Sequence, residues 1–177
     1  YKIFVESSYN PIDPQDKTFI DDYSSFHEEL DVLQKRLANL YTIAFSDCSG
    51  SEAMFKLIAI YSIYVGRPFI GEAMHSTYPE VLRCIESDLE DAKVIYDAQI
   101  QLHSNTGRYE LPKNMPHISG ALRWSNDLRR RVVIPFQQLV FVNKESLDTS
   151  DGERICRKLK ELLQLLHKFD KIGRASC

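Results

Sequence analysis

The chain has 177 residues, of which 44% are hydrophobic and 27% charged, and its formal net charge is −3. These values are typical of a globular protein and exclude a disordered or collagen-like chain. No run approaches the roughly 18 apolar residues of a membrane-spanning helix, and the balance of acid and base argues against nucleic-acid binding. The four cysteines lie far apart, which predicts reduced thiols. The chain begins with Tyr rather than Met, which favours a piece of a longer protein.

Two interleaved apolar series predict a long amphipathic helix from residue 18 to about residue 47. Within each series the apolar residues recur every seven positions, as in a coiled coil. The series are Phe19, Phe26, Leu33 and Leu40, and Tyr23, Leu30, Leu37 and Ala44. Thr18 is the expected N-cap, with Asp21 reaching back toward it. The pattern predicts a narrow contact surface that includes Leu33 and Leu37, for a helix of this chain or of a partner.

A second helix is predicted from Ser49 to Val65, with a capping box formed by Ser49 and Glu52. Gly66 and Pro68 are expected to end it, since Gly favours the C-terminal cap position and Pro cannot continue a helix. Because this helix is apolar on almost all sides, it is the predicted buried centre of the bundle.

Residues 67–76 are predicted to form a short extended link, after which Thr77 caps a third helix that ends at Gly107. The apolar face of this helix consists of Tyr78, Leu82, Ile85, Leu89, Ala92 and Tyr96. The acidic residues Glu86, Asp88, Glu90 and Asp91 lie on the opposite face, where we expect solvent. Residues 108–116, with Pro112 and Pro116, are predicted to form an extended strap.

A fourth helix is predicted from Pro116 to Pro135, which kinks or ends it. A fifth begins at a capping box of Ser150 and Glu153 and ends near residue 170. Their apolar positions are Ile118, Ala121, Leu122, Trp124, Leu128 and Val132, and Ile155, Leu159, Leu162, Leu166 and Phe169. The fold class is therefore all-α, an elongated bundle of about five amphipathic helices with proline-rich straps. The expected divisions are an irregular N-terminal segment (1–17), a helical module (18–170) and an irregular C-terminal extension (171–177).

Reactive groups form no recognisable constellation in the sequence. Phosphate-binding glycine loops and the G-x-S-x-G nucleophile motif are absent, which argues against nucleotide hydrolysis and acyl transfer. Glu72 and His75 have the spacing of a di-iron ligand pair, but no second copy exists to complete a centre. We therefore expect no catalytic, cofactor-binding or metal-binding residue, no cofactor and no small-molecule substrate. A small metal protein based on Glu72 and His75 is the weakest alternative.

A run of arginines, Arg129-Arg130-Arg131, lies in the fourth helix. Successive helical residues point about 100° apart, so the run does not form one patch. We expect a solvated or salt-bridged helix end, with Asp127 pairing with Arg131 at i,i+4. Docking onto an acidic protein surface is one alternative, and binding of a phosphate group is a weaker one.

Gly120 and Trp124 lie one helical turn apart in the fourth helix. A glycine inside a helix costs about 1 kcal/mol relative to alanine, so another helix approaching its bare backbone is expected to compensate. The two residues predict a small-against-large packing joint, either within this chain or with another part of an assembly.

Several separated motifs resemble the tail of dynein heavy chains, and the axonemal members more than the cytoplasmic ones. Residues 113–124 read KNMPHISGALRW, which is similar to the family signature N-M-P-P-V-A-G-A-L-x-W. The segments FSDCSG (45–50), FKL (55–57), Arg67-Pro68 and LEDAKVIY (89–96) resemble other family motifs in the same order. His117 replaces the usual second Pro and Gly66 an acidic residue. The resemblance spans roughly residues 18–170.

The resemblance implies a noncatalytic structural segment of an axonemal dynein heavy chain tail. The family's ATP-hydrolysing motor lies in another part of the heavy chain. The implied partners are dynein intermediate and light chains and other heavy chains, at the axoneme of a cilium or flagellum in the cytoplasmic cytoskeleton. A free-standing helical adaptor, or a truncated isoform lacking the motor, is the alternative, for which Cys177 would be a natural C-terminus.

Overall fold

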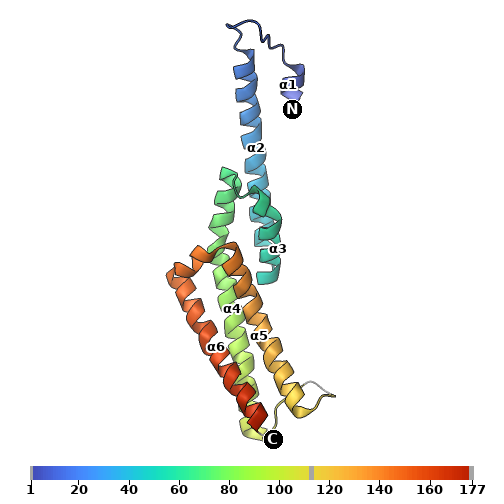
Figure 1. The fold of residues 1–177 in the computed structure, drawn as a ribbon, viewed down its shortest axis with the longest axis vertical. Helices are drawn as coiled ribbons and strands as arrows, with labels where there is room; N and C mark the ends of the chain where they lie inside the picture. Colours follow the sequence, from blue (N-terminus) through green and yellow to red (C-terminus); the bar gives the residue numbers. More distant parts are fainter. Residues whose placement is uncertain (1, 112–113, 176–177) are drawn as a thin grey trace. The chain divides into compact units, whose positions relative to one another are not determined.

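The computed structural model describes residues 2–111 and 114–175, and all regular structure in those residues is helical (Figure 1). The all-α prediction is therefore confirmed. The α-helices are α1 (Lys2–Glu6), α2 (Thr18–Ser46), α3 (Ser51–Tyr61), α4 (Pro68–Thr106), α5 (His117–Val142) and α6 (Ser150–Ala175). Two short 3-10 helices are η1 (Ser62–Tyr64) and η2 (Lys144–Asp148). None of the helices in the described ranges is both long and apolar enough to cross a membrane.

The chain divides into two compact units. Unit 1 contains α1, α2 and the chain from Leu57 to Thr77, and unit 2 contains Cys48–Lys56 and the chain from Tyr78 onward. In unit 2, the long helices α5 and α6 pack along each other and against the part of α4 that follows Tyr78 (Figure 1).

The core of unit 2 follows the apolar patterns of the third and fifth predicted helices. All six predicted apolar residues of α4 and all five of α6 are at most 8% exposed, with Ile155 and Leu166 fully buried. In α5, Ala121, Leu128 and Val132 are buried as predicted, together with Ser125 and Leu139. Full burial of each large apolar side chain stabilises the folded state by about 1.5–3 kcal/mol.

The predicted extended link at residues 67–76 is wrong, because α4 begins at Pro68 and continues through Pro79. Pro68 occupies the first helical turn, where a missing N–H costs nothing. An internal proline costs about 3 kcal/mol. Burial of Ile70, Met74 and Val81, each at most 2% exposed, is enough to outweigh that cost. Thr77, the predicted N-cap, is inside the helix.

The second predicted helix is shorter and less buried than its composition suggests. It ends as α3 at Tyr61 and continues as the 3-10 turn η1. Met54, Phe55 and Ile58 are buried, whereas Ile60 is 65% and Ile63 77% exposed. The helix is therefore not the buried centre of a bundle, because one apolar face finds no packing partner among the described residues.

Several helix ends differ from the predicted caps. At the start of α2, the Thr18 amide donates to Asp16 Oδ1 at 2.8 Å. At the start of α6, the Gly152 amide donates to Thr149 Oγ1 at 3.1 Å. The capping side chains thus lie one or two residues before the predicted Thr18 and Ser150, because adjacent Asp and Thr side chains compete for the same free amides. The α3 helix begins at Ser51, after Gly50 with φ +118°.

The helix boundaries predicted at Gly107 and at Pro135 differ in outcome. Gly107, with φ +68°, ends α4 as expected, but Pro135 lies inside α5 and does not end it. The segments expected to be irregular contain helix, since α1 falls within 1–17 and α6 continues to Ala175. Pro112 of the strap and Cys177 lie outside the described residues.

Candidate assembly surfaces

The contact surface predicted on the first helix is rotated from its expected position. The buried residues of α2 are Gln34, Ala38, Tyr41 and Phe45. Leu33 is 58% exposed and Leu37 is half-buried. The first predicted series is therefore not the buried face, and the second borders it. Sequence periodicity gives the spacing of a helix face but cannot choose between adjacent apolar faces of similar strength.

Tyr41 fixes the orientation of α2 within unit 1. The Tyr41 hydroxyl lies 2.8 Å from Thr77 Oγ1, and the Thr77 hydroxyl in turn donates to the Met74 carbonyl at 2.7 Å. The Tyr41 ring packs edge-on against Tyr61, with centroids 5.0 Å apart. Burying an aromatic ring whose hydroxyl keeps a hydrogen bond is favourable. The burial of Tyr41 was not predicted, although its spacing of three residues from Ala38 and four from Phe45 is that of one helix face.

The N-terminal segment folds back onto the start of α2. The Phe4 ring lies 5.3 Å from that of Phe26, and the Tyr9 ring lies 5.3 Å from that of Phe19. The Ser7 hydroxyl donates to the carboxylate of Asp22. This segment therefore partly covers the first two residues of the predicted first series.

The remainder of that face of α2 is open. Its exposed apolar residues are Val32 (48%), Leu33 (58%), Leu40 (58%) and Ile43 (60%). Glu29, which precedes them, and Arg36, which lies between them, are on the same face and are also exposed, and within the described residues neither forms an ion pair or a hydrogen bond. We name the set of six residues Glu29, Val32, Leu33, Arg36, Leu40 and Ile43 the α2 stripe.

Gly120 and Trp124 both contribute to the packing of unit 2. Gly120 is buried, and the Trp124 ring lies 5.0 Å from Phe169 of α6 and 6.5 Å from Tyr96 of α4. Trp124 therefore contacts two helices of its own chain. The sequence alone could not identify Tyr96 and Phe169 as the residues that contact Trp124, because they lie far from it along the chain.

The strap after α4 is anchored by aromatic packing. Tyr109 stacks on His103 with centroids 4.0 Å apart and meets the edge of Phe169 at 5.0 Å. The Gln99 amide donates to the Glu110 carbonyl at 2.8 Å. These contacts hold the strap beside the ring cluster that contains Trp124.

Glu86 joins α4 to α6 through charge. Arg154 donates to both of its carboxylate oxygens at 2.7 and 2.8 Å, and Lys158 donates at 2.6 Å. These hydrogen bonds lower the pKa of the Glu86 carboxyl from its ordinary value near 4.5 to about 2. Glu86 was predicted to face solvent, but its side chain is only 15% exposed. The periodicity of α4 could not show that Arg154 and Lys158 of α6 lie against Glu86, because it carries no information about neighbouring helices.

The arginine run is dispersed, as the helical geometry predicts. Arg129 donates to Asp170 of α6 at 2.6 Å, and Arg131 lies 3.9 Å from Asp91 of α4. The expected pair of Asp127 and Arg131 is wrong, since Asp127 lies 3.8 Å from Arg123 instead. Tertiary contact with Asp91 has replaced the local pairing.

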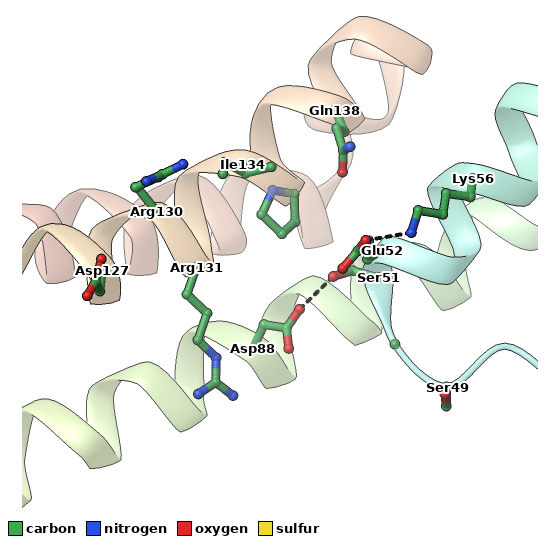
Figure 2. Close-up of a pocket in the computed structure, with 12 residues that line it drawn as sticks. Ser49, Ser51, Glu52, Lys56, Asp88, Asp127, Arg130, Arg131, Ile134 and Gln138 are labelled. Atoms are coloured by element: carbon green, nitrogen blue, oxygen red, sulfur yellow. Dashed lines mark hydrogen bonds and ion pairs between the residues drawn. The ribbon is translucent and has the colours of Figure 1, made fainter.

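An open groove of about 620 Å³ lies in unit 2 beside this run (Figure 2). In Figure 2, Arg131 extends from α5 toward α4, and the Ser51 hydroxyl donates to Asp88 at 2.8 Å. Lys56 and Glu52 form an ion pair at 2.6 Å on its rim. Ile134 and Pro135 supply apolar surface. Acidic and basic side chains alternate around the groove and largely neutralise one another, so it has no strong charge preference.

Glu72 and His75, the basis of the weakest alternative, have no third potential metal ligand beside them among the described residues. Glu72 and His75 are both exposed on α4. In residues 2–111 and 114–175, no three His, Cys, Asp or Glu side chains lie together in an arrangement that could hold a metal ion. Among the described residues, Cys48, Cys84 and Cys156 form no disulfide, and burial raises the pKa of the Cys84 thiol.

Known proteins similar to this chain match it over almost its whole length. The family model described as dynein heavy chain, N-terminal region 1, matches residues 1–172. The ciliary dynein beta chain of Tripneustes gratilla is 34% identical over 175 residues, which cover 96% of this chain. Dynein axonemal heavy chain 17 of Mus musculus is 32% identical over 165 residues, or 93% of the chain. The chain spans about 4% of the length of each of these relatives.

Proposed function

This chain belongs to the dynein heavy chain family through its N-terminal region 1, and from that membership we propose that it is a noncatalytic structural segment of an axonemal dynein tail. Its role is to contribute to the association of heavy chains and to the docking of intermediate and light chains. The parent protein would be a microtubule motor ATPase of cilia or flagella, located at the axoneme.

The open α2 stripe is the observation that carries the assembly role. It places four large apolar residues on one exposed helix face, each between 48% and 60% accessible to solvent. Contiguous apolar surface of this kind on a folded protein marks interaction sites. The stripe contains no Ser, Cys, His or Lys, and its two charged residues, Glu29 and Arg36, are about two helical turns apart, so it does not resemble a nucleophile activated by an adjacent base.

The docking of intermediate and light chains is the finer part of the proposal, and family membership alone supports it. The relatives are named as ciliary, axonemal and flagellar dynein chains. We propose the same location for this chain, and no activity in nucleotide hydrolysis, because the sequence contains no P-loop.

Capture from an axonemal extract tests the proposal. The purified 177-residue chain serves as bait, and bound proteins are identified by mass spectrometry. We expect dynein heavy, intermediate and light chains to be enriched. A bait carrying Leu33→Asn and Leu40→Asn should lose the heavy chains, whereas Ile63→Asn, an exposed apolar residue off the stripe, is the matched control. A wild-type bait that enriches no dynein subunit would contradict the proposed function.

A phosphate-release assay with ATP tests the noncatalytic part. We expect no turnover above buffer, because no glycine-rich loop is present to hold the phosphates. Activity that survives successive columns and disappears on a point substitution in this chain would refute it.

A further inference from the structure

The solvent-facing side of α6 carries a row of basic residues. Its exposed positions between residues 157 and 171 include a set that lies within about 100° around the helix axis. The set consists of Arg157, Lys160, Gln164, His167, Lys168 and Lys171. No acidic residue falls in this sector between its two ends, although the whole chain has a net charge of −3. We name these residues the α6 basic stripe.

The charges of the stripe are not neutralised within the described chain. Arg154 and Lys158, on another side of the same helix, both bind Glu86. By contrast, no side chain of the stripe forms an ion pair or a hydrogen bond with any residue that the structure describes. The cationic side chains therefore face solvent along about 21 Å of helix. They include neighbours three residues apart, between which like charges repel, and an oppositely charged partner would relieve that repulsion.

The apolar face of α6 is not available to a ligand. The five apolar residues predicted for it, from Ile155 to Phe169, are each at most 7% exposed. A basic amphipathic helix can lie in a membrane surface or in the groove of a partner protein, but both modes use its apolar face. The folded chain therefore offers only the charged side of this helix, and a ligand must be recognised through charge.

The stripe fits an acidic polypeptide better than a nucleic acid. It contains no aromatic ring on which a base could stack. Glu153, one turn before Arg157, and Glu161, beside the stripe, are exposed and would repel the closely spaced phosphates of a duplex. The carboxylates of an Asp- or Glu-rich segment can instead match single basic residues, because the exposed positions recur every three or four residues.

From this charge pattern we propose that the α6 basic stripe binds an acidic polypeptide segment. The stripe belongs to unit 2 and shares no residue with the α2 stripe, which belongs to unit 1. The proposal therefore adds a second docking surface and does not rest on the proposed function.

Fluorescence anisotropy with a fluorescein-labelled oligoglutamate peptide tests the proposal on the purified 177-residue chain. We expect saturable binding that weakens as salt is added, because ions screen exposed charges beyond about 10 Å at 0.1 M salt. A variant with Lys160→Glu and Lys168→Glu should bind about tenfold or more weakly than wild type. Lys17→Glu with Arg67→Glu makes the same change in net charge at exposed positions in unit 1 and should bind as wild type does.

Circular dichroism first establishes that each variant is as helical as wild type. We expect this result because each new glutamate in α6 has a basic neighbour three residues away, Arg157 or Lys171. A second variant, Lys160→Gln with Lys168→Gln, removes the two charges without reversing them and should give an intermediate loss of affinity. Duplex DNA and vesicles of phosphatidylserine are measured in the same assay and should bind more weakly than the peptide.

A wild-type chain that does not bind the oligoglutamate peptide would overturn the proposal, as would a charge-reversed α6 variant that binds it normally. An equal loss in the Lys17 and Arg67 variant would show that net charge alone governs binding, which also contradicts a defined site. Tighter binding of duplex DNA or vesicles, lost in the same α6 variant, would assign the stripe to that ligand instead. None of these results bears on the proposed function, which the α2 variants test separately by capture of dynein subunits.

Discussion

Gly152 lies where the backbone of η2 comes closest to the first turn of α6. A Cβ added at this position would meet the Ser146 carbonyl oxygen, and would lie 2.5 Å from Leu147 Cα and 2.7 Å from the Leu147 carbonyl oxygen. Three backbone atoms therefore occupy the space that any other residue would need. Real Cβ atoms do not approach this closely, so Gly152→Ala requires one of the two segments to move.

The local hydrogen bonds make that movement costly. The Thr149 hydroxyl donates to the Ser146 carbonyl at 2.7 Å and accepts from the Gly152 amide at 3.1 Å. Ser146 is itself buried, and its amide donates to Asn143. A shift of α6 away from η2 would weaken the cap and open the contact. Overpacking of this kind costs about 1–3 kcal/mol, and backbone atoms cannot change rotamer to relieve it.

Alanine also favours the helix over glycine by about 1 kcal/mol, which offsets part of that cost. With an overpacking cost at the upper end of its range, about 3 kcal/mol, the net loss is about 2 kcal/mol. For a chain of this length, that loss lowers the melting temperature by roughly 4–8 °C. Thermal unfolding followed by circular dichroism measures the change.

Gly66→Ala is the matched control. A Cβ at Gly66 would meet nothing within 4 Å, and its φ lies outside the left-handed region. The substitution should leave the melting temperature unchanged or raise it slightly, because alanine restricts the unfolded chain. If Gly152→Ala melts at or above the wild-type temperature, the close approach of η2 and α6 is not a constraint and the reasoning is wrong.

Other substitutions follow from the contacts of α2, α4 and α5. Because the pKa of Glu86 is lowered in the folded chain, its ion pairs stabilise the fold above pH 4.5, and this contribution is lost as the pH falls toward 2. Glu86→Gln should therefore flatten the decline in melting temperature between pH 4.5 and pH 2. An unchanged dependence of melting temperature on pH would refute the ion-pair argument. Trp124→Ala removes two ring contacts and should cost about 2–3 kcal/mol, less than a fully buried aromatic, which chemical denaturation measures; a cost below that of an exposed substitution would contradict the joint. Gly120→Leu adds a large side chain at a buried position and should destabilise the chain despite its better helix propensity, so an equal or higher denaturation midpoint would disprove close packing there. Leu37→Asn should lower the melting temperature more than Leu33→Asn, because Leu37 is half-buried and Leu33 exposed; equal effects would mean that both lie on a packed face.

The sequence determined the helices whose apolar face is unambiguous. In α4 and α6, each apolar position predicted from the four-three spacing is buried, from Tyr78 to Tyr96 and from Ile155 to Phe169. A single apolar stripe flanked by charged residues leaves a helix only one face to bury. The motif order also identified the family, because sequence similarity needs no tertiary information.

Tertiary structure decided which face packs where the sequence offered several. On α2, Gln34 and Ala38 are buried while Leu33 is exposed, because the position of Tyr41 against Thr77 sets the rotation of the helix. The gain from packing an entire face exceeds the difference in hydrophobicity between neighbouring residues. The expectation that a new helix begins near Pro79 failed for the same reason, because buried residues before and after it, such as Met74 and Val81, keep α4 continuous.

Contacts between distant segments were the other contribution of the fold. The pairing of Glu86 with Arg154 and the packing of Trp124 on Phe169 join residues far apart in the sequence. The narrow space at Gly152 exists only because η2 returns against α6. A sequence fixes what each helix can bury and which residues can pair, because those properties belong to the residues themselves. Which of these possibilities is realised depends on the surfaces that the chain brings together, and that choice belongs to the tertiary structure.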